Sequence, residues 1–283
     1  MNYRNARVAD YYQQMRPLYD AYSQRSLAWH VGLCVDGERN GPAALQRSNE
    51  ILVKGLPLTR GMRALDAGCG IGGLAFFLAE RFGLEVDGIS IAPANLVAAR
   101  RIARERGLAT QVSFLDHDFM RLDSLPKTYQ LVLNQESICY TSNYRTYLEG
   151  VRDRLVPGGW FRCVDGFLGP VELDPRHCAL HAQIQVGWRI PPLRRASDYL
   201  EVLDAVGFQD LVHEDLSPMA RATAEGFQEA AKYADEDLRR DFLGLADMAM
   251  FRQHLDACGA YGECLLDGSM RYALIGGRWP GPR

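Results

Sequence analysis

Residues 65–73 read Leu-Asp-Ala-Gly-Cys-Gly-Ile-Gly-Gly, and this stretch decides the fold. An apolar run ends at Asp66, and a helical pattern begins at Leu74. Three glycines alternate between them: Gly68, Gly70 and Gly72. Glycine lets the main chain turn tightly and approach a ligand closely, and the start of a helix leaves N–H groups that can bind one. The stretch therefore predicts a strand, a tight loop and a helix that together bind a nucleotide-like cofactor.

The class of cofactor depends on Asp66. The spacing of Gly68, Gly70 and Gly73 also fits a dinucleotide-binding dehydrogenase. However, a carboxylate two residues before the first glycine would repel a pyrophosphate, and the next predicted strand, residues 84–89, lacks a clear terminal acid for a ribose. The carboxylate suits a cationic cofactor with an amino-acid tail. The pattern resembles the first motif of class I S-adenosylmethionine-dependent methyltransferases. An NAD-dependent oxidoreductase, a non-catalytic cofactor-binding protein and a glycine turn without a ligand are the weaker alternatives.

Composition narrows the class of protein. The 283 residues are 47% hydrophobic and 24% charged, which predicts a soluble protein with one large domain and a cap. A net charge of −3 gives no electrostatic reason to expect nucleic-acid binding. The sequence contains no apolar run of the roughly 18 residues that a membrane helix needs. The seven cysteines are scattered without a C-x-x-C pair, so we expect a reducing cytoplasm and no metal site.

Strands and helices are predicted to alternate, which is typical of an α/β fold with a parallel sheet covered by helices on both faces. The predicted strands are 62–67, 84–89, 111–116, 129–134, 159–165 and 209–215. The predicted helices are 43–54, 73–82, 93–106, 143–155 and 197–206, with one or two more within 218–257.

The predicted domains are an N-terminal helical lid, residues 1–60, and a core, residues 61–283, with a helical cap inserted at about 167–257. The proline-containing segment 167–196 is expected to be irregular. The resemblance implies a Rossmann-like class I methyltransferase sheet whose last strand, 270–276, is antiparallel, with a helical lid over the carboxyl ends of the strands.

Further contacts to S-adenosylmethionine follow from the same resemblance. It implies Ser90 and Asn95 for the ribose hydroxyls, Asp118 and Phe119 for the adenine, and Asn134 at the end of the fourth strand. Asp116 is an alternative to Asp118, and an exposed helix position is the alternative reading of Asn95.

Glu136 is the candidate catalytic residue. By position alone, just past an apolar strand, it is either a general base, a solvated loop residue or a partner of the cofactor's ammonium group. Residues 134–140, Asn-Gln-Glu-Ser-Ile-Cys-Tyr, resemble the Asn-Asn-Glu-Ser-x-x-Tyr motif of prenyl diphosphate C-methyltransferases, and residues 267–275 resemble that family's ending. The resemblance implies that an alkene attacks the methyl group and that Glu136 removes a proton from the resulting carbocation. Gln135 departs from the motif.

The substrate is expected to be a small isoprenoid of terpenoid biosynthesis. Candidate aromatic walls that could stabilise a cation are Tyr22, Trp29, Phe167, Trp188 and Tyr261. Candidate diphosphate contacts are His30, Arg194, Arg195 and Arg271. Family analogy adds Mg²⁺ on the diphosphate. The alternatives are plain core packing for the aromatic residues and solvated surface positions for the arginines.

Three other readings remain open at the level of sequence. The first is methylation of an O or N atom of a small molecule, with Glu136 or His30 as the base, and the second is a cyclopropane-forming relative. In the third, the acceptor is a prenyl group already attached to an indole. His177 and His181 lie four residues apart and could bind a metal if their segment is helical, but no Glu lies between them and Pro175 is close by. A homo-oligomer is also left open.

Overall fold

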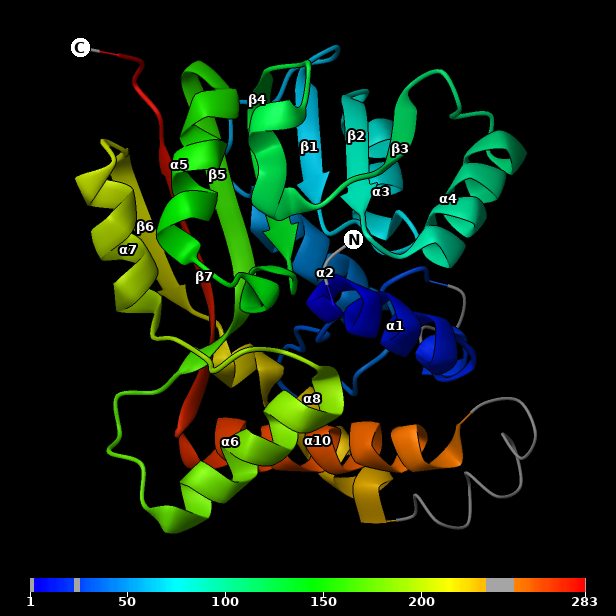
Figure 1. Ribbon diagram of the computed structural model, residues 1–283, viewed down its shortest axis with the longest axis vertical. Coiled ribbons are helices and arrows are strands. Elements are labelled where there is room, and N and C mark those ends of the chain that lie inside the picture. The colour runs from blue at the N-terminus through cyan, green and yellow to red at the C-terminus, as the bar shows by residue number, and fades with distance from the viewer. Residues whose placement is uncertain (1–2, 23–25, 233–246, 283) are drawn as a thin grey trace. The chain divides into compact units, whose positions relative to one another are not determined.

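The computed structural model describes residues 3–22, 26–232 and 247–282 (Figure 1). The chain divides into two compact units. Unit 1 comprises Met1–Ser48, Gly166–Arg195 and Asp215–Tyr272. Unit 2 comprises Asn49–Asp165, Ala196–Glu214 and Ala273–Arg283. None of the described helices is both long enough and apolar enough to cross a membrane.

A seven-stranded sheet in the order β3-β2-β1-β4-β5-β7-β6 forms the centre of the fold (Figure 1). Its strands are β1 (Arg63–Ala67), β2 (Glu85–Ser90), β3 (Val112–Asp116), β4 (Tyr129–Gln135), β5 (Leu155–Leu168), β6 (Gln209–Asp215) and β7 (Met270–Arg278). The first five strands pair in parallel. Because the chain order reverses between β1 and β4, this is the point in an open α/β sheet where ligands bind.

Strand β7 runs antiparallel to β5. Trp279 and Gly159 lie together, since the Trp279 N–H donates to the Gly159 carbonyl at 2.7 Å. Just past the end of β5, ten residues after Gly159, the Gly169 N–H donates to the carbonyl of Ser269 at 2.8 Å. The partner numbers fall on one strand as they rise on the other, which confirms the predicted antiparallel last strand.

Glycine and proline residues mark ends of two helices in unit 2. The described helices of this unit are α3 (Gly73–Phe82), α4 (Pro93–Glu105), α5 (Tyr144–Arg154) and α7 (Ala196–Ala205), and α2 (Pro42–Val53) enters this unit from unit 1. Helix α3 ends at Phe82, because the φ of 68° at Gly83 turns the chain so that the Leu84 N–H donates back to the Leu78 carbonyl at 3.4 Å. Helix α4 starts with Pro93, which has the fixed φ that a first helical residue needs.

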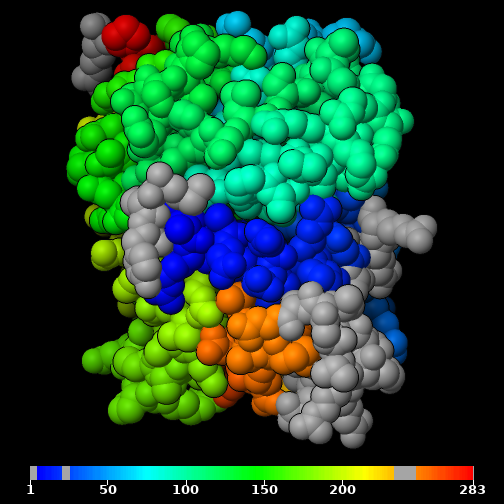
Figure 2. Space-filling model, turned by 45° about the vertical axis from the view of Figure 1, so that its right-hand side comes forward, coloured from blue at the N-terminus to red at the C-terminus, as the bar shows by residue number. Residues whose placement is uncertain are grey.

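The described part of unit 1 includes the start of α2 and the helices α1 (Tyr3–Tyr22), α6 (Pro175–Trp188), α8 (Ser217–Lys232) and α10 (Met248–Asp267). Helices α6, α8 and α1 all contact α10, and Figure 2 shows the blue residues of α1 directly against the orange residues of α10. Two glycines allow the close packing. A Cβ on Gly262 would lie 2.4 Å from the Ala224 carbonyl oxygen, and one on Gly187 would lie 2.3 Å from that of Gln253.

The sequence-based prediction was wrong in two places. Residues 167–196 are not irregular throughout, because α6 begins at Pro175 after Asp174, whose carboxylate accepts the His177 N–H at 2.8 Å. Residues 1–60 are not helical throughout, because no helix forms between residues 26 and 41. Part of the helical prediction for 218–257, residues 233–246, lies outside the described residues.

Candidate cofactor and catalytic site

The loop after β1 buries a carboxylate. Asp66 is only 2% exposed, and its carboxylate accepts the backbone N–H of Ala75 in the first turn of α3. Burial raises the pKa of Asp66 to about 7, and the Ala75 hydrogen bond only partly opposes this. The Oδ2 atom has no hydrogen-bond partner within the described residues. A buried carboxyl oxygen without a donor is the group that a cationic ligand would satisfy.

Positive φ angles and different close neighbours explain why this loop contains glycines. All three have positive φ, at 97° for Gly68, 52° for Gly70 and 92° for Gly72. A Cβ on Gly68 would lie 2.4 Å from the Ser137 Cβ, and one on Gly72 would lie 2.5 Å from the Phe114 ring. The absence of a side chain at Gly68 therefore allows the loop after β4 to approach the loop after β1. At Gly72 it allows the Phe114 ring of β3 to pack against the loop. Their predicted contacts with a cofactor stay predictions.

At the end of β2, Asn95 is buried. It is 1% exposed on α4, so it is not an exposed helix residue, and its Oδ1 has no partner in the described parts of the chain. The Ser90 hydroxyl oxygen accepts the Ala92 N–H at 3.2 Å and so shapes the turn into α4. Asn95 thus offers a second buried acceptor at the same edge of the sheet as Asp66, in keeping with the predicted ribose contact.

The loop after β3 carries the predicted adenine contacts. Asp118 Oδ1 accepts the Met120 N–H at 2.9 Å and caps the short helix η1 (Phe119–Ser124). The Phe119 ring lies edge-on to Tyr147, with centroids 5.3 Å apart. The alternative, Asp116, is exposed at the end of β3. The structure therefore holds Asp118 and Phe119 in fixed positions, and their role toward adenine stays a prediction.

Asn134 joins two loops rather than pointing at solvent. Its Nδ2 donates to the Ala67 carbonyl at 2.9 Å and to the Ser137 Oγ at 2.8 Å, and its Oδ1 accepts the Tyr147 hydroxyl at 2.5 Å. The Ser137 hydroxyl also donates to the Ala67 carbonyl, at 2.6 Å. Because the side chain is fully used, any contact of Asn134 with a cofactor falls to its backbone. Sequence reasoning missed the part that Tyr147 plays in this network.

Glu136 lies in an unusual backbone conformation. Its φ of 48° is in the left-handed region, which costs a residue with a long side chain of order 1 kcal/mol or more. Its N–H donates to the Val164 carbonyl at 2.9 Å, which extends the pairing of β4 with β5 by one residue. The next turn is held by Asp165, 4% exposed, whose Oδ2 accepts the Cys139 N–H at 3.1 Å. Hydrogen bonds on both sides of the turn therefore hold the backbone that carries Glu136.

The charge of Glu136 affects the pKa values of two cysteine thiols. Burial raises the pKa values of Cys139 and Cys163 well above the usual range, and the negative charges of Asp165 and Glu136 raise them further. Both cysteines therefore stay as neutral thiols at physiological pH. They form an uncharged surface beside the carboxylate.

Unit 1 contains all nine predicted substrate residues, and three of them, Trp29, Trp188 and Tyr261, lie in an aromatic cluster. The Trp29 ring stacks on Tyr19 at 4.9 Å, and Trp188 lies 4.9 Å from Tyr261. The Tyr11 hydroxyl bonds to His254 Nδ1 at 2.7 Å, and burial lowers the pKa of His254 to about 4, so the imidazole is neutral. Sequence reasoning missed Tyr11 and His254, because these two hydrogen-bonded residues lie 243 positions apart in the chain.

The other predicted substrate residues have separate surroundings. Phe167 is buried at 1% exposure, and His30 is buried with its Nδ1 3.1 Å from the Val31 carbonyl. The Arg195 guanidinium donates to the Gly169 carbonyl at 2.5 Å, and that of Arg271 lies 3.6 Å from Asp215. Arg194 is exposed. The side chain of Tyr22 lies outside the described residues.

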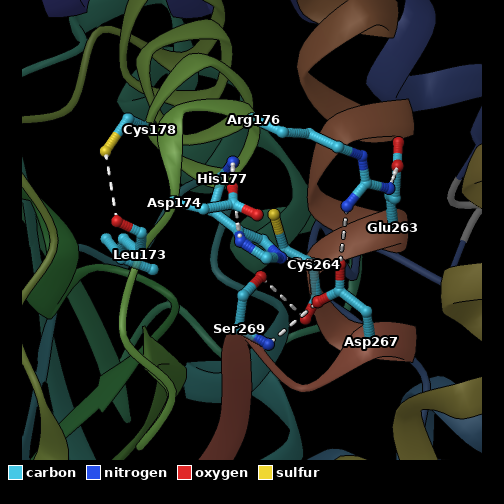
Figure 3. A network of polar contacts seen from close by, with 9 residues as sticks. All are labelled: Leu173, Asp174, Arg176, His177, Cys178, Glu263, Cys264, Asp267 and Ser269. Carbon is cyan, nitrogen blue, oxygen red and sulfur yellow. Dashed lines mark hydrogen bonds and ion pairs between the residues drawn. The ribbon is translucent and has the colours of Figure 1, made fainter.

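His177 and His181 are not arranged as a metal site. Figure 3 shows His177 between Asp174, at 2.9 Å, and Asp267, at 3.3 Å, in an ionic network that links α6 to α10. Arg176 joins it through Asp267 and Glu263. Over the described residues, no group of three or more His, Cys, Asp or Glu side chains could hold a metal ion. The described residues therefore do not fit a magnesium ion held by the protein's own side chains.

Part of the chain matches a known family model. Residues 64–159 match the family model described as "Methyltransferase domain". A sterol 24-C-methyltransferase of Eremothecium gossypii is 27% identical over 216 residues, which are 74% of this chain and 58% of the relative. An S-adenosyl-L-methionine-dependent Diels-Alderase of Talaromyces variabilis is 32% identical over 182 residues, which are 62% of each chain. This chain thus spans about three fifths of the length of these two relatives.

A solved structure shares the whole fold. The geranyl diphosphate C-methyltransferase of Streptomyces coelicolor, crystallised with Mg²⁺, geranyl-S-thiolodiphosphate and S-adenosyl-L-homocysteine, superposes with a TM-score of 0.77. The superposition covers 98% of both chains at 19% sequence identity. The predicted Rossmann-like methyltransferase fold is thereby confirmed. At this level of identity the likeness concerns the fold alone.

Proposed function

We propose that the protein is an S-adenosylmethionine-dependent C-methyltransferase that methylates an alkene carbon of an isoprenoid, with Glu136 as the general base. The methyltransferase domain and its fold support the reaction class. Two buried acceptors have no partner within the described residues, Asp66 Oδ2 and Asn95 Oδ1, and they fit a cofactor with a cationic tail and ribose hydroxyls. When bound, this cofactor supplies an electrophilic methyl group.

The observation that carries the proposal is the conformation of Glu136. Strained backbone persists where the surrounding structure enforces it, and such positions cluster at active sites. Here the Val164 carbonyl and the Asp165 carboxylate hold the two sides of the turn. A glutamate whose backbone is held in this way, at the carboxyl edge of the sheet, is suited to remove a proton from an acceptor.

The chemistry requires such a base. The π electrons of the acceptor alkene form the new carbon–carbon bond, and the positive charge that leaves the sulfonium then resides on an acceptor carbon. The Glu136 carboxylate takes a proton from a neighbouring carbon, and the C–H electron pair restores the alkene. Aromatic rings such as Trp29 and Tyr261 are proposed to contact the hydrocarbon.

The proposed acceptor is a prenyl diphosphate. The resemblance at residues 134–140 and 267–275 supports this class. The alternative within the same chemistry is a sterol, which the similarity to a sterol 24-C-methyltransferase supports. A methylation assay with five-, ten- and fifteen-carbon prenyl diphosphates, with and without Mg²⁺, and with a sterol separates the two. The product should gain one methylene unit by mass spectrometry.

Glu136→Gln tests the base. We expect turnover to fall by about a hundredfold or more, because general-base catalysis contributes at least that much, while affinity for S-adenosylhomocysteine is unchanged. Glu149→Gln, on the exposed face of α5, is the matched control and should retain activity. Wild-type turnover in Glu136→Gln would refute the assignment.

A second candidate function is cyclisation of a polyene without methyl transfer. The 32% identity to a Diels-Alderase favours it. A cyclase would turn over with S-adenosylhomocysteine in place of the methyl donor, whereas a methyltransferase would not. The requirement for Glu136 separates them too, because a concerted cyclisation needs no proton acceptor.

A further inference from the structure

Two buried polar atoms at the carboxyl edge of the sheet have opposite hydrogen-bonding character. Asp66 Oδ2 is an acceptor without a donor, and Gln135 Nε2 is a donor without an acceptor, as judged over the described residues. Asp66 is already part of the proposed function, but Gln135 has no role in it. A buried donor and a buried acceptor left unsatisfied each cost free energy that a ligand carrying the complementary groups would recover.

The two side chains share one face of the sheet. In the parallel ladder Asp66 lies in register with Leu133, and Gln135 follows Leu133 by two residues. Since side chains alternate with a period of two, Asp66, Leu133 and Gln135 all project to the same side. With strands about 4.8 Å apart and about 3.3 Å per residue, the Asp66 and Gln135 Cα atoms are about 8 Å apart. One small group can therefore contact both side chains.

We propose that Gln135 binds the carboxylate of the cofactor's amino-acid tail while Asp66 binds its ammonium group, so that the pair recognises the zwitterion. This inference rests on the proposed function, because it assigns a further residue to the same cofactor. Gln135 is also the one position at which residues 134–140 depart from the motif that they resemble.

The nearest cation on this face does not take that role. Arg162 of β5 lies in register with Leu133 and so shares the face with Gln135. However, its guanidinium carbon lies 5.4 Å over the Trp160 ring, and its Cδ is close to Gly276 of β7. The Arg162 side chain therefore extends toward β7, away from β1. On β4, the strand next to Asp66, Gln135 is the residue of this face whose side-chain donor has no partner within the described residues.

The test is a titration calorimetry matrix with the full-length protein. The ligands are S-adenosylhomocysteine, its decarboxylated analogue, which lacks the carboxylate, and its deaminated analogue, which lacks the ammonium group. The variants are Gln135→Leu, Gln135→Glu and Asp66→Asn. Gln209→Leu, an exposed glutamine on β6, is the matched control.

The expected pattern links each residue to one ligand group. Gln135→Leu should weaken S-adenosylhomocysteine binding about tenfold or more, as expected for a hydrogen bond to a charged group. It should leave affinity for the decarboxylated analogue unchanged. Gln135→Glu, which keeps the shape and adds a negative charge, should weaken S-adenosylhomocysteine more strongly. Asp66→Asn should show the opposite pattern. It should weaken the binding of S-adenosylhomocysteine and leave the affinity for the deaminated analogue unchanged.

Different failures have different meanings. If the wild-type protein does not bind S-adenosylhomocysteine, the proposed function fails and the inference with it. If the wild type binds but both Gln135 variants keep wild-type affinity, or lose affinity equally for the decarboxylated analogue, only the inference on Gln135 is overturned. The near-isosteric Gln135→Glu keeps the test decisive if Gln135→Leu does not fold.

Discussion

Cofactor binding should depend on pH through Asp66. Its pKa is raised to about 7 by burial, so about half of the protein carries a neutral Asp66 at pH 7 before ligand binds. A ligand ammonium group prefers the ionised carboxylate. Lowering the pH therefore reduces the fraction of protein that is ready to bind, and binding releases a proton.

The magnitude follows from the titration. At pH 8 about nine tenths of Asp66 is ionised, at pH 6 about one tenth, and at pH 5 about one hundredth. Affinity for S-adenosylhomocysteine should therefore fall about tenfold between pH 8 and pH 6 and about a hundredfold by pH 5. The latter corresponds to about 2.7 kcal/mol.

Calorimetry at pH 5–8, in two buffers with different ionisation enthalpies, measures both the affinity and the number of protons released. Asp66→Asn should bind more weakly at pH 8 and lose most of the pH dependence. An affinity that stays constant from pH 8 to pH 5 in the wild type, with no proton release, would refute the reasoning.

The sign of the effect on stability is opposite to that on binding. A carboxyl whose folded pKa is raised favours the folded state at low pH. The contribution of Asp66 to the free energy of unfolding is fully present below its ordinary pKa of about 4 and is lost as the pH rises toward 7. Saturating S-adenosylhomocysteine should reduce this loss, which urea unfolding at several pH values measures.

Three further substitutions have expected outcomes in urea unfolding. Gly68→Ala should cost about 2 kcal/mol or more, because φ is 97° and the new Cβ would meet Ser137; a smaller cost would mean that the loop relaxes. Tyr147→Phe should cost about 1 kcal/mol, since it removes the hydrogen bond to Asn134, and no change would show that the bond is weak. Arg101→Ala, in an exposed ion pair on α4, should change stability by less than about 0.5 kcal/mol; a larger change would contradict its surface character.

The elements of the sheet were predictable because their signals are local. Helix α3 was predicted as 73–82 and occupies Gly73–Phe82, since Gly72 and Gly83 mark its ends. Helix α6 was missed although Asp174 and Pro175 form a standard start, because the prolines around it were interpreted only as helix breakers.

The candidate site was predictable in its residue types and not in its energetics. Asp66 and Glu136 stand out in the sequence by their positions after apolar strands. The raised pKa of Asp66 and the left-handed backbone of Glu136 come from tertiary packing that no short stretch encodes. Asn134 illustrates the limit, because its side chain is occupied by Tyr147, Ser137 and Ala67, which a strand-end pattern cannot reveal.

The shared anchor at the Ala67 carbonyl has a consequence for how the protein can change. Asn134 and Ser137 both donate to this one oxygen, so the glycine loop and the Glu136 loop are fastened to each other inside unit 2. Under the proposed function, the methyl donor bound at the glycine loop and the general base Glu136 keep the same separation whatever acceptor is present. New acceptors could then be selected by substitutions in unit 1, while the reaction geometry is inherited unchanged.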